Sequence, residues 1–370
     1  MATLPTTTNE ITAEWMTEAL RGSGTIDADV SVTEVLTDAA NVGVGFMGEV
    51  ATVGVHYDGD AGDAPTRLIA KFATQSPEIK TMMHPTRVYE REHRFYAELA
   101  SKTPVRTPDV YHVTCETADE PLAEQYLLLL EDLSGLVLGD QVAGVSPEQA
   151  ESALVGLARH HAAFWDGKGL ENAPFAPPIN GLLNRAGQGI YEASLPGFKQ
   201  VFADALLPEM VPVADAYTAN HPLLLDRLAA MPNTLVHFDY RADNLFFEPD
   251  ADGSQGSVVV IDWQAISVGG GAADVGYFIG QNLSTSDRRS HEDALLHRYH
   301  DTLTENGVTG YDYATFFEDY RLGLVYGWVI PVFAVGSLDA SSERAVALWT
   351  NVIERIQDAI FQHNAQEFIS

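Results

Sequence analysis

The hydrophobic pattern changes its period near Gly135, and this change constrains the fold more than any other feature of the sequence. Before Gly135, apolar and polar residues alternate in short runs, as in strands with one buried face. Five runs are expected to be strands: residues 30–36, 49–57, 68–72, 110–115 and 125–130. A short helix over residues 9–22 precedes them, and one helix over residues 78–101 is inserted after the third strand.

After Gly135, apolar residues recur at helical spacing. Ser146-Pro-Glu-Gln149 has proline at the first helical position and a capping-box glutamine, so a helix should begin here and reach Trp165. Further helices are expected at about 193–207, 212–230, 287–305, 313–335 and 340–366. A strand pair around residues 245–262 interrupts them.

These patterns together predict an α+β, bilobal chain of the protein-kinase-like layout. Residues 1–133 should form an N-terminal lobe with a five-stranded antiparallel sheet plus one helix. Residues 134–370 should form a larger, mainly helical C-terminal lobe.

Composition excludes several classes of protein. The single cysteine, Cys115, rules out an internal disulfide framework and a cysteine-based zinc site, and favours a reducing, cytoplasmic setting. The N-terminus lacks the basic and apolar regions of a signal peptide. The longest apolar run, residues 322–335, is shorter than the ~20 residues of a membrane span, so no membrane partner is expected.

The formal charge of −31 repels nucleic-acid backbones, so no nucleic-acid partner is expected. Such acidity could attract a cationic substrate. Because the acids are spread along the whole chain, a generally acidic, solvated surface is the favoured interpretation.

One pair of motifs indicates the chemistry. His237, Asp239 and Asn244 have the H-x-D-x-x-x-x-N spacing, and Asp262 follows the apolar run Val258-Val-Val-Ile. Phosphoryl transfer from a nucleotide needs one carboxylate facing the attacking hydroxyl, and an amide and a second carboxylate to hold Mg²⁺ against the phosphates. We expect Asp239 to accept or orient the hydroxyl proton and Asn244 and Asp262 to bind the metal.

Several neighbouring residues are assigned supporting roles. Arg241 is placed to neutralise charge on the γ-phosphoryl group, while His237 is interpreted as a structural histidine that fixes the loop. Asp274 is expected to cap the N-terminus of a helix, with bracing of the catalytic loop as the alternative. His160 and His161 face different ways on a helix, so this pair is not expected to bind a metal.

The segment Gly43-Val-Gly-Phe-Met-Gly-Glu-Val50 fits G-x-G-x-x-G-x-V. Its glycines, Gly43, Gly45 and Gly48, would let the backbone pass close to phosphates. A dinucleotide-binding loop is the rival interpretation, but it needs a following helix. The residues after Gly48 alternate, which favours a strand and hence a hairpin over ATP.

Lys71 lies within the apolar strand run, where a lysine needs an anionic partner or a solvent-facing position. We expect it to hold the α- and β-phosphates and to be aligned by Glu92, with Glu90 as the alternative because the rotation of the helix is uncertain. At the end of the fifth strand, the backbones of Leu130 and Glu131 should meet the adenine edge.

With these residues in place, the chain resembles the small-molecule kinases of the protein-kinase-like superfamily: aminoglycoside phosphotransferases, choline kinases and, most closely, the ecdysteroid-kinase-like group. The motifs that carry the resemblance span roughly residues 40–280. The resemblance implies ATP and Mg²⁺ as cofactors and phosphorylation of a hydroxyl on a small molecule. An aminoglycoside acceptor and a pseudokinase without transfer activity are the alternatives.

Three departures from kinase patterns narrow this expectation. Phe238 stands where this family commonly has glycine, which would narrow the acceptor side of the site. Asp262 is followed by Trp263-Gln264 rather than Phe-Gly. The path from Asp262 to Asp274 is too short for a protein-kinase activation segment, so a protein substrate is disfavoured.

Overall fold

The computed structural model describes residues 4–37, 43–44, 48–249, 255–335 and 342–369. The chain divides into two compact units, the first made of residues 1–101 and 107–135 and the second of residues 102–106 and 136–370. The sequence had placed this boundary after Leu133 and had not assigned residues 102–106 to the second unit. They join it because Val260 N donates to Arg106 O at 2.9 Å.

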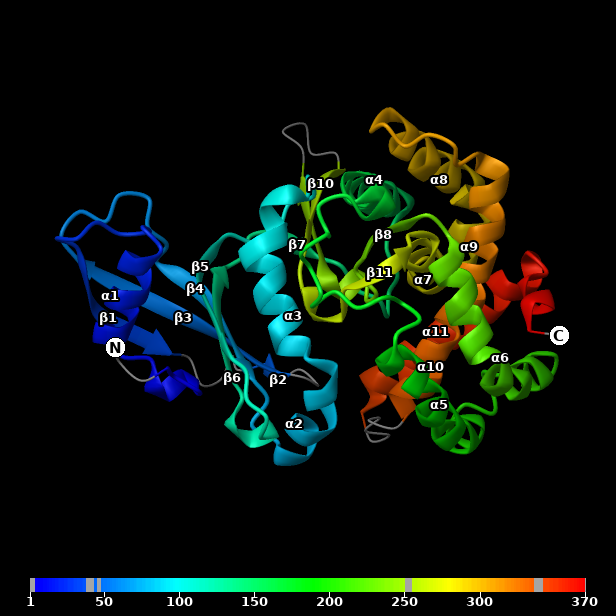
Figure 1. The fold of residues 1–370 in the computed structure, drawn as a ribbon, viewed down its shortest axis with the longest axis horizontal. Coiled ribbons are helices and arrows are strands. Elements are labelled where there is room, and N and C mark those ends of the chain that lie inside the picture. Colours follow the sequence, from blue (N-terminus) through cyan, green and yellow to red (C-terminus); the bar gives the residue numbers. More distant parts are fainter. Residues whose placement is uncertain (1–3, 38–42, 45–47, 250–254, 336–341, 370) are drawn as a thin grey trace. The chain divides into compact units, whose positions relative to one another are not determined.

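The first unit is built on one antiparallel sheet with the strand order β1-β3-β4-β6-β5 (Figure 1). The five predicted strands are β1 (Ser31–Thr37), β3 (Gly48–Asp58), β4 (Arg67–Ala73), β5 (Val110–Glu116) and β6 (Gln125–Glu131). A two-residue strand, β2 (Gly43–Val44), pairs with β3 and extends the predicted sheet.

The two faces of this sheet carry different elements. Helix α1 (Ala13–Gly22) buries Trp15 and Leu20 in a core with Leu68 and Phe72 of β4. Because side chains alternate along a strand, Lys71 of β4 points to the opposite face.

The single helix predicted over residues 78–101 is divided in the structure. It consists of α2 (Pro77–Met83), a 3₁₀ turn, α3 (Val88–Arg94) and a π-helical turn over Phe95–Leu99. The break falls at Pro85, which has no N–H to donate, and at Arg87, whose φ of 55° is left-handed. This break sets the direction and rotation of α3, which sequence periodicity alone did not resolve.

The second unit is mainly helical. Its helices are α4 (Pro147–Ala163), α5 (Leu182–Val201), α6 (Met210–Ala230), α7 (Ala272–Asn282), α8 (Thr285–Glu305), α9 (Tyr313–Gly327), α10 (Val329–Ala334) and α11 (Glu343–Gln362). The helix predicted over 193–207 was wrong in its bounds, because two weak helix formers, Gly187 and Gly189, obscured the first half of α5. The helix predicted over 313–335 divides at Trp328.

Short strands in the second unit position the two motifs that contain Asp239 and Asp262. Strands β7 (Val137–Leu138), β9 (Leu245–Pro249) and β10 (Gln255–Val260) form one sheet, and β8 (Asn233–Val236) pairs with β11 (Ser267–Gly270). Residues 237–244 therefore connect β8 to β9, and Asp262 follows β10. We call residues 237–244 the catalytic loop, after the catalytic role predicted for Asp239. Within the described residues, no helix combines the length and apolarity of a membrane span.

Candidate active site

Asp274 holds the backbone at the start of the catalytic loop. Its Oδ2 accepts from His237 N at 2.7 Å, and its Oδ1 accepts from Phe238 N at 2.8 Å. Asp274 lies inside the first turn of α7, whose N-cap is Gly271, so the prediction of an N-cap was wrong. Both carboxylate oxygens brace the loop, which was the alternative role.

Phe238 adopts a left-handed conformation with φ of 68°. This region costs a non-glycine residue roughly 1–2 kcal/mol. The hydrogen bond from its N–H to Asp274 and the packing of its ring on Tyr326, with centroids 5.4 Å apart, offset that cost. The half-buried ring lies next in sequence to Asp239.

The carboxylate of Asp239 is held by two neutral donors. Tyr277 O–H donates to Oδ1 at 3.0 Å, and Asn244 Nδ2 donates to Oδ2 at 2.9 Å. Burial and the Asp239 carboxylate raise the pKa of Tyr277 well above its ordinary value, so its proton stays on the phenol. Sequence reasoning missed Tyr277, although its place one helical turn after Asp274 was an available signal.

Asn244 and Asp262 present the oxygens that a hard cation prefers. The Nδ2 of the buried Asn244 donates to the backbone and to the side chain of Asp239, so its carbonyl oxygen is the atom of this side chain that could serve as the predicted metal ligand. Asp262 has a left-handed φ of 66°, and Gln264 Nε2 donates to its Oδ2 at 3.1 Å. Oxygen donors of this kind fit Mg²⁺.

A fully buried histidine links the catalytic loop to the strand end that carries Asp262. His237 Nδ1 accepts from Asp239 N at 3.3 Å, and His237 Nε2 donates to Ile261 O at 2.9 Å. The imidazole also contacts the buried Trp263 edge-on, with centroids 4.7 Å apart. These contacts agree with the structural role predicted for His237.

Arg241 is paired with acids of its own loop. It lies 3.3 Å from Asp239 Oδ1 and donates to Asp243 Oδ2 at 2.8 Å. Burial alone would lower the pKa of this guanidinium, but Asp239, Tyr277 and the nearby carboxylates raise it above its ordinary value. Its expected contact with a γ-phosphoryl group stays a prediction.

In the described part of the chain, no group of three or more His, Cys, Asp or Glu side chains could by itself hold a metal ion. A kinase-type site does not need one, because the nucleotide phosphates supply the other ligands. Binding of Mg²⁺ by Asn244 and Asp262 stays a prediction.

In the first unit, Lys71 forms a bidentate ion pair. Its Nζ donates to Glu92 Oε1 at 2.9 Å and Oε2 at 2.7 Å, and Tyr126 O–H donates to the same carboxylate at 2.6 Å. Of the two glutamates considered, Glu92 bonds Lys71, whereas Glu90 lies 3.7 Å from Arg94 on the surface of α3. Glu92 is 1% exposed, so almost no water reaches the carboxylate of this ion pair.

The glycine motif forms a hairpin in its described part. Gly43 pairs with Val50 and Val44 pairs with Glu49 across β2 and β3. A Cβ on Gly48 would lie 2.7 Å from Phe72 O, so this position has no room for a side chain. Gly45 lies outside the described residues. A strand, not a helix, follows Gly48, as expected for a hairpin and unlike a dinucleotide-binding loop.

The end of β6 is fixed by its neighbours. Leu130 pairs with Ile69 of β4 and with Val110 of β5, and Glu131 Oε2 accepts from Asp109 N at 3.2 Å. These contacts place Leu130 and Glu131 at the strand exit, but their adenine contacts stay a prediction.

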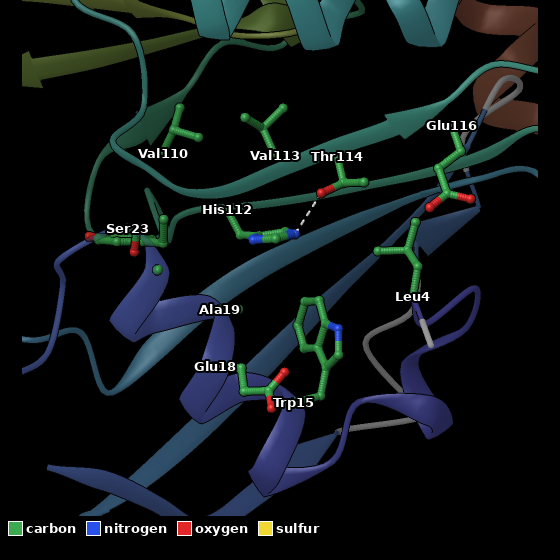
Figure 2. Close-up of a pocket in the computed structure, with 12 residues that line it drawn as sticks. Leu4, Trp15, Glu18, Ala19, Ser23, Val110, His112, Val113, Thr114 and Glu116 are labelled. Carbon is green, nitrogen blue, oxygen red and sulfur yellow. Dashed lines mark hydrogen bonds between the residues drawn. The ribbon is translucent and has the colours of Figure 1, made fainter. Parts of the chain in front are cut away.

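A pocket of about 550 Å³ lies elsewhere in the first unit (Figure 2). Trp15 and Glu18 of α1 line one side of it, and His112 and Thr114 of β5 line the other. This pocket is on the α1 side of the sheet, whereas Lys71 points to the opposite face. It is therefore separate from the candidate phosphate site.

Comparisons with known proteins give the family and the fold. Residues 42–308 match the ecdysteroid kinase-like family. Similar solved structures include an amicoumacin kinase in complex with AMP-PNP, Ca²⁺ and Ami (TM-score 0.53, 11% identity, 92% of each chain). Another is a Plasmodium vivax ethanolamine kinase (TM-score 0.52, 9% identity, 93% of this chain and 85% of that one). At these identities the likeness shows the protein-kinase-like fold.

One curated relative matches over a shorter stretch. It is the "Probable acyl-CoA dehydrogenase IBR3" of Arabidopsis thaliana, 27% identical over 199 residues, which cover 51% of this chain. The match spans 22% of the length of that relative.

Proposed function

Because the chain belongs to the ecdysteroid kinase-like family, we propose that it transfers the γ-phosphate of ATP, with Mg²⁺, to a hydroxyl of a small molecule. The observation that carries this proposal is the arrangement around Asp239. One carboxylate is oriented by Tyr277 and Asn244, and the same Asn244 keeps its carbonyl oxygen for a cation.

In the proposed reaction, the acceptor hydroxyl attacks the γ-phosphorus, and Asp239 accepts or orients its proton. The bond from the γ-phosphorus to the bridging oxygen breaks, and ADP leaves with that electron pair. Asn244 and Asp262 would hold Mg²⁺, which would supply neutralisation of the charge on the phosphates. Lys71, aligned by Glu92, holds the α- and β-phosphates, and Gly43, Gly45 and Gly48 are the glycines proposed to let the backbone approach them.

Features of the chain narrow the acceptor. The short path from Asp262 to α7 leaves no activation segment, which disfavours a protein substrate. Next to Asp239, the half-buried ring of Phe238 packs on the buried ring of Tyr326. The bulk of Phe238 beside Asp239 narrows the acceptor side of the proposed site, and an aminoglycoside remains the alternative acceptor.

A pseudokinase that binds nucleotide without transfer is the alternative function. Such proteins usually lack one of the four residues that transfer requires, and Lys71, Asp239, Asn244 and Asp262 are all present. The single cysteine fits the cytoplasmic location that we propose with this function.

The proposal is tested by measuring ATP consumption against a panel of possible acceptors. The panel contains steroid alcohols, macrolides, sugars, choline and aminoglycosides. Because of the match to a protein named as an acyl-CoA dehydrogenase, hydroxylated acyl-CoA thioesters are included. With an acceptor in hand, Asp239→Ala should abolish transfer while Mg·ATP still binds, and Asp262→Ala should weaken Mg·ATP binding as well. Transfer at the parent rate by Asp239→Ala would refute the role of Asp239, and ATP binding without any transfer would favour the pseudokinase.

A further inference from the structure

The histidine pair His160–His161 in α4 has no role in the proposed chemistry, yet both rings are buried. The two rings have different partners. His160 bonds to the side chain of Thr103 through Oγ1 and to the backbone of β8 through Leu235 O. His161 instead contacts Asp274, the residue that braces the catalytic loop.

The contacts of His161 form a directed chain of hydrogen bonds. Its Nε2 lies 3.3 Å from Asp274 Oδ2, and because a carboxylate can only accept, Nε2 carries the proton. Its Nδ1 lies 2.7 Å from the hydroxyl of Tyr299, which can then donate to it. His161, Tyr299 and Asp274 are each no more than 1% exposed, so water does not compete for these bonds.

This series of hydrogen bonds ends at the backbone of the catalytic loop. Asp274 Oδ2 accepts from His161 and from His237 N, while its Oδ1 accepts from Phe238 N. His237 in turn receives the N–H of Asp239 and donates to Ile261 O. A rotation of the Asp274 carboxylate would therefore disturb both Asp239 and the residue before Asp262.

We propose that His161 and Tyr299 are positioning residues for phosphotransfer: Tyr299 fixes the tautomer of His161, and His161 fixes the carboxylate of Asp274 against the catalytic loop. A fixed carboxylate keeps Phe238 in its left-handed conformation and so keeps Asp239 aimed. These hydrogen bonds connect residues of three helices, α8, α4 and α7. This arrangement explains why a buried histidine is needed at a position far in sequence from the loop.

The variants for the test are chosen to separate positioning from stability. Tyr299→Phe removes only the hydroxyl and keeps the stack on Phe316, whose ring centroid is 5.1 Å away. His161→Leu removes both contacts, and His161→Gln returns an N–H donor near the position of Nε2. Tyr191→Phe is the control, because it deletes a buried hydroxyl that donates to Ala214 O and accepts from Trp328 Nε1, each at 2.9 Å.

The first measurement needs no acceptor and no nucleotide. Amide hydrogen exchange of His237 and Phe238 is followed by NMR in protein labelled with ¹⁵N-histidine and ¹⁵N-phenylalanine, together with the ring nitrogens of His161. In Tyr299→Phe and His161→Leu, both amides should exchange about tenfold faster or more, and in His161→Gln they should regain protection. Tyr191→Phe should leave them at the parent rate.

The second measurement rests on the proposed function and uses ATP hydrolysis with water as the acceptor. Tyr299→Phe and His161→Leu should lower kcat about tenfold with little change in KM for ATP, and His161→Gln should recover kcat. The inference is overturned if exchange at His237 and Phe238 in Tyr299→Phe matches that in Tyr191→Phe, or if His161→Gln behaves as His161→Leu. Undetectable hydrolysis by the parent protein would count against the proposed function, while the exchange result would still decide the positioning role.

Discussion

The hydroxyl of Tyr277 in α7 donates a hydrogen bond to Oδ1 of Asp239 across 3.0 Å. One helix therefore supports the catalytic loop in two ways, since Asp274 of α7 holds its backbone and Tyr277 holds its carboxylate. Four residues give testable predictions: Tyr277, Phe238, Glu92 and Glu292.

Removing the Tyr277 hydroxyl should slow catalysis without preventing nucleotide binding. In Tyr277→Phe, Asp239 loses one of the donors that orient it, so kcat should fall about tenfold, as expected for one hydrogen bond, while KM for ATP changes little. Steady-state kinetics of ATP turnover measure both quantities. An unchanged kcat would show that Asn244 and Arg241 orient the carboxylate without Tyr277.

At position 238, a glycine variant should be more stable than an alanine variant, which is the reverse of the usual order. Alanine commonly stabilises a protein relative to glycine, but φ of 68° is costly for any residue with a Cβ. Both Phe238→Ala and Phe238→Gly lose the contact with Tyr326, so the glycine variant should be the more stable of the two by about 1 kcal/mol. Urea unfolding gives the comparison, and a more stable alanine variant would contradict the prediction.

Replacing Glu92 in the first unit should destabilise the protein, whereas replacing Glu90 should have little effect. Glu92→Gln removes the carboxylate that Lys71 contacts through both oxygens, and breaking a buried pair of this kind costs about 3–5 kcal/mol. KM for ATP should also rise, because Lys71 loses its alignment. Glu90→Gln is the control, since its contact with Arg94 is partly exposed and should be worth less than about 1 kcal/mol. Equal losses in thermal unfolding would argue against a special role for Glu92.

Glu292 in α8 should make stability depend on pH. Its carboxylate accepts from Arg288 at 2.7 Å and from His363 at 2.8 Å, and Tyr320 also donates to it. Burial alone would raise its pKa, but His363 and Arg288 lower it below the ordinary value of 4.5.

A carboxyl group with a lowered folded pKa stabilises the protein above its unfolded pKa, and this stability is lost as pH falls through the folded value. Glu292→Gln should therefore reduce the free energy of unfolding at neutral pH by about 3 kcal/mol. The difference from the parent protein should shrink below pH 4.5. Urea unfolding across this range tests the prediction, and a difference that grows on acidification would refute it.

Local patterns in the sequence predicted much of the fold. Alternation located the five long strands, and the capping box located the start of α4, because each signal depends on neighbours within a few residues. The spacing of His237, Asp239 and Asn244, with Asp262 after an apolar strand, indicated which residues to examine for the same reason.

The remaining assignments depended on contacts between segments far apart in the chain. The choice of Glu92 over Glu90 followed from the break at Arg87, which sets the rotation of α3. The bracing role of Asp274 required α7 to pack beside the catalytic loop, and the contact of Tyr277 with Asp239 required the same packing.

What the sequence determined by itself was the order and type of most elements and the choice of candidate reactive side chains. Only the tertiary structure decided which groups orient them, as with the chain from Tyr299 through His161 to Asp274. The physical reason is that a buried polar group must find its partner wherever packing brings one. That partner can lie more than a hundred residues away, as Tyr299 does from His161, where no local pattern records it.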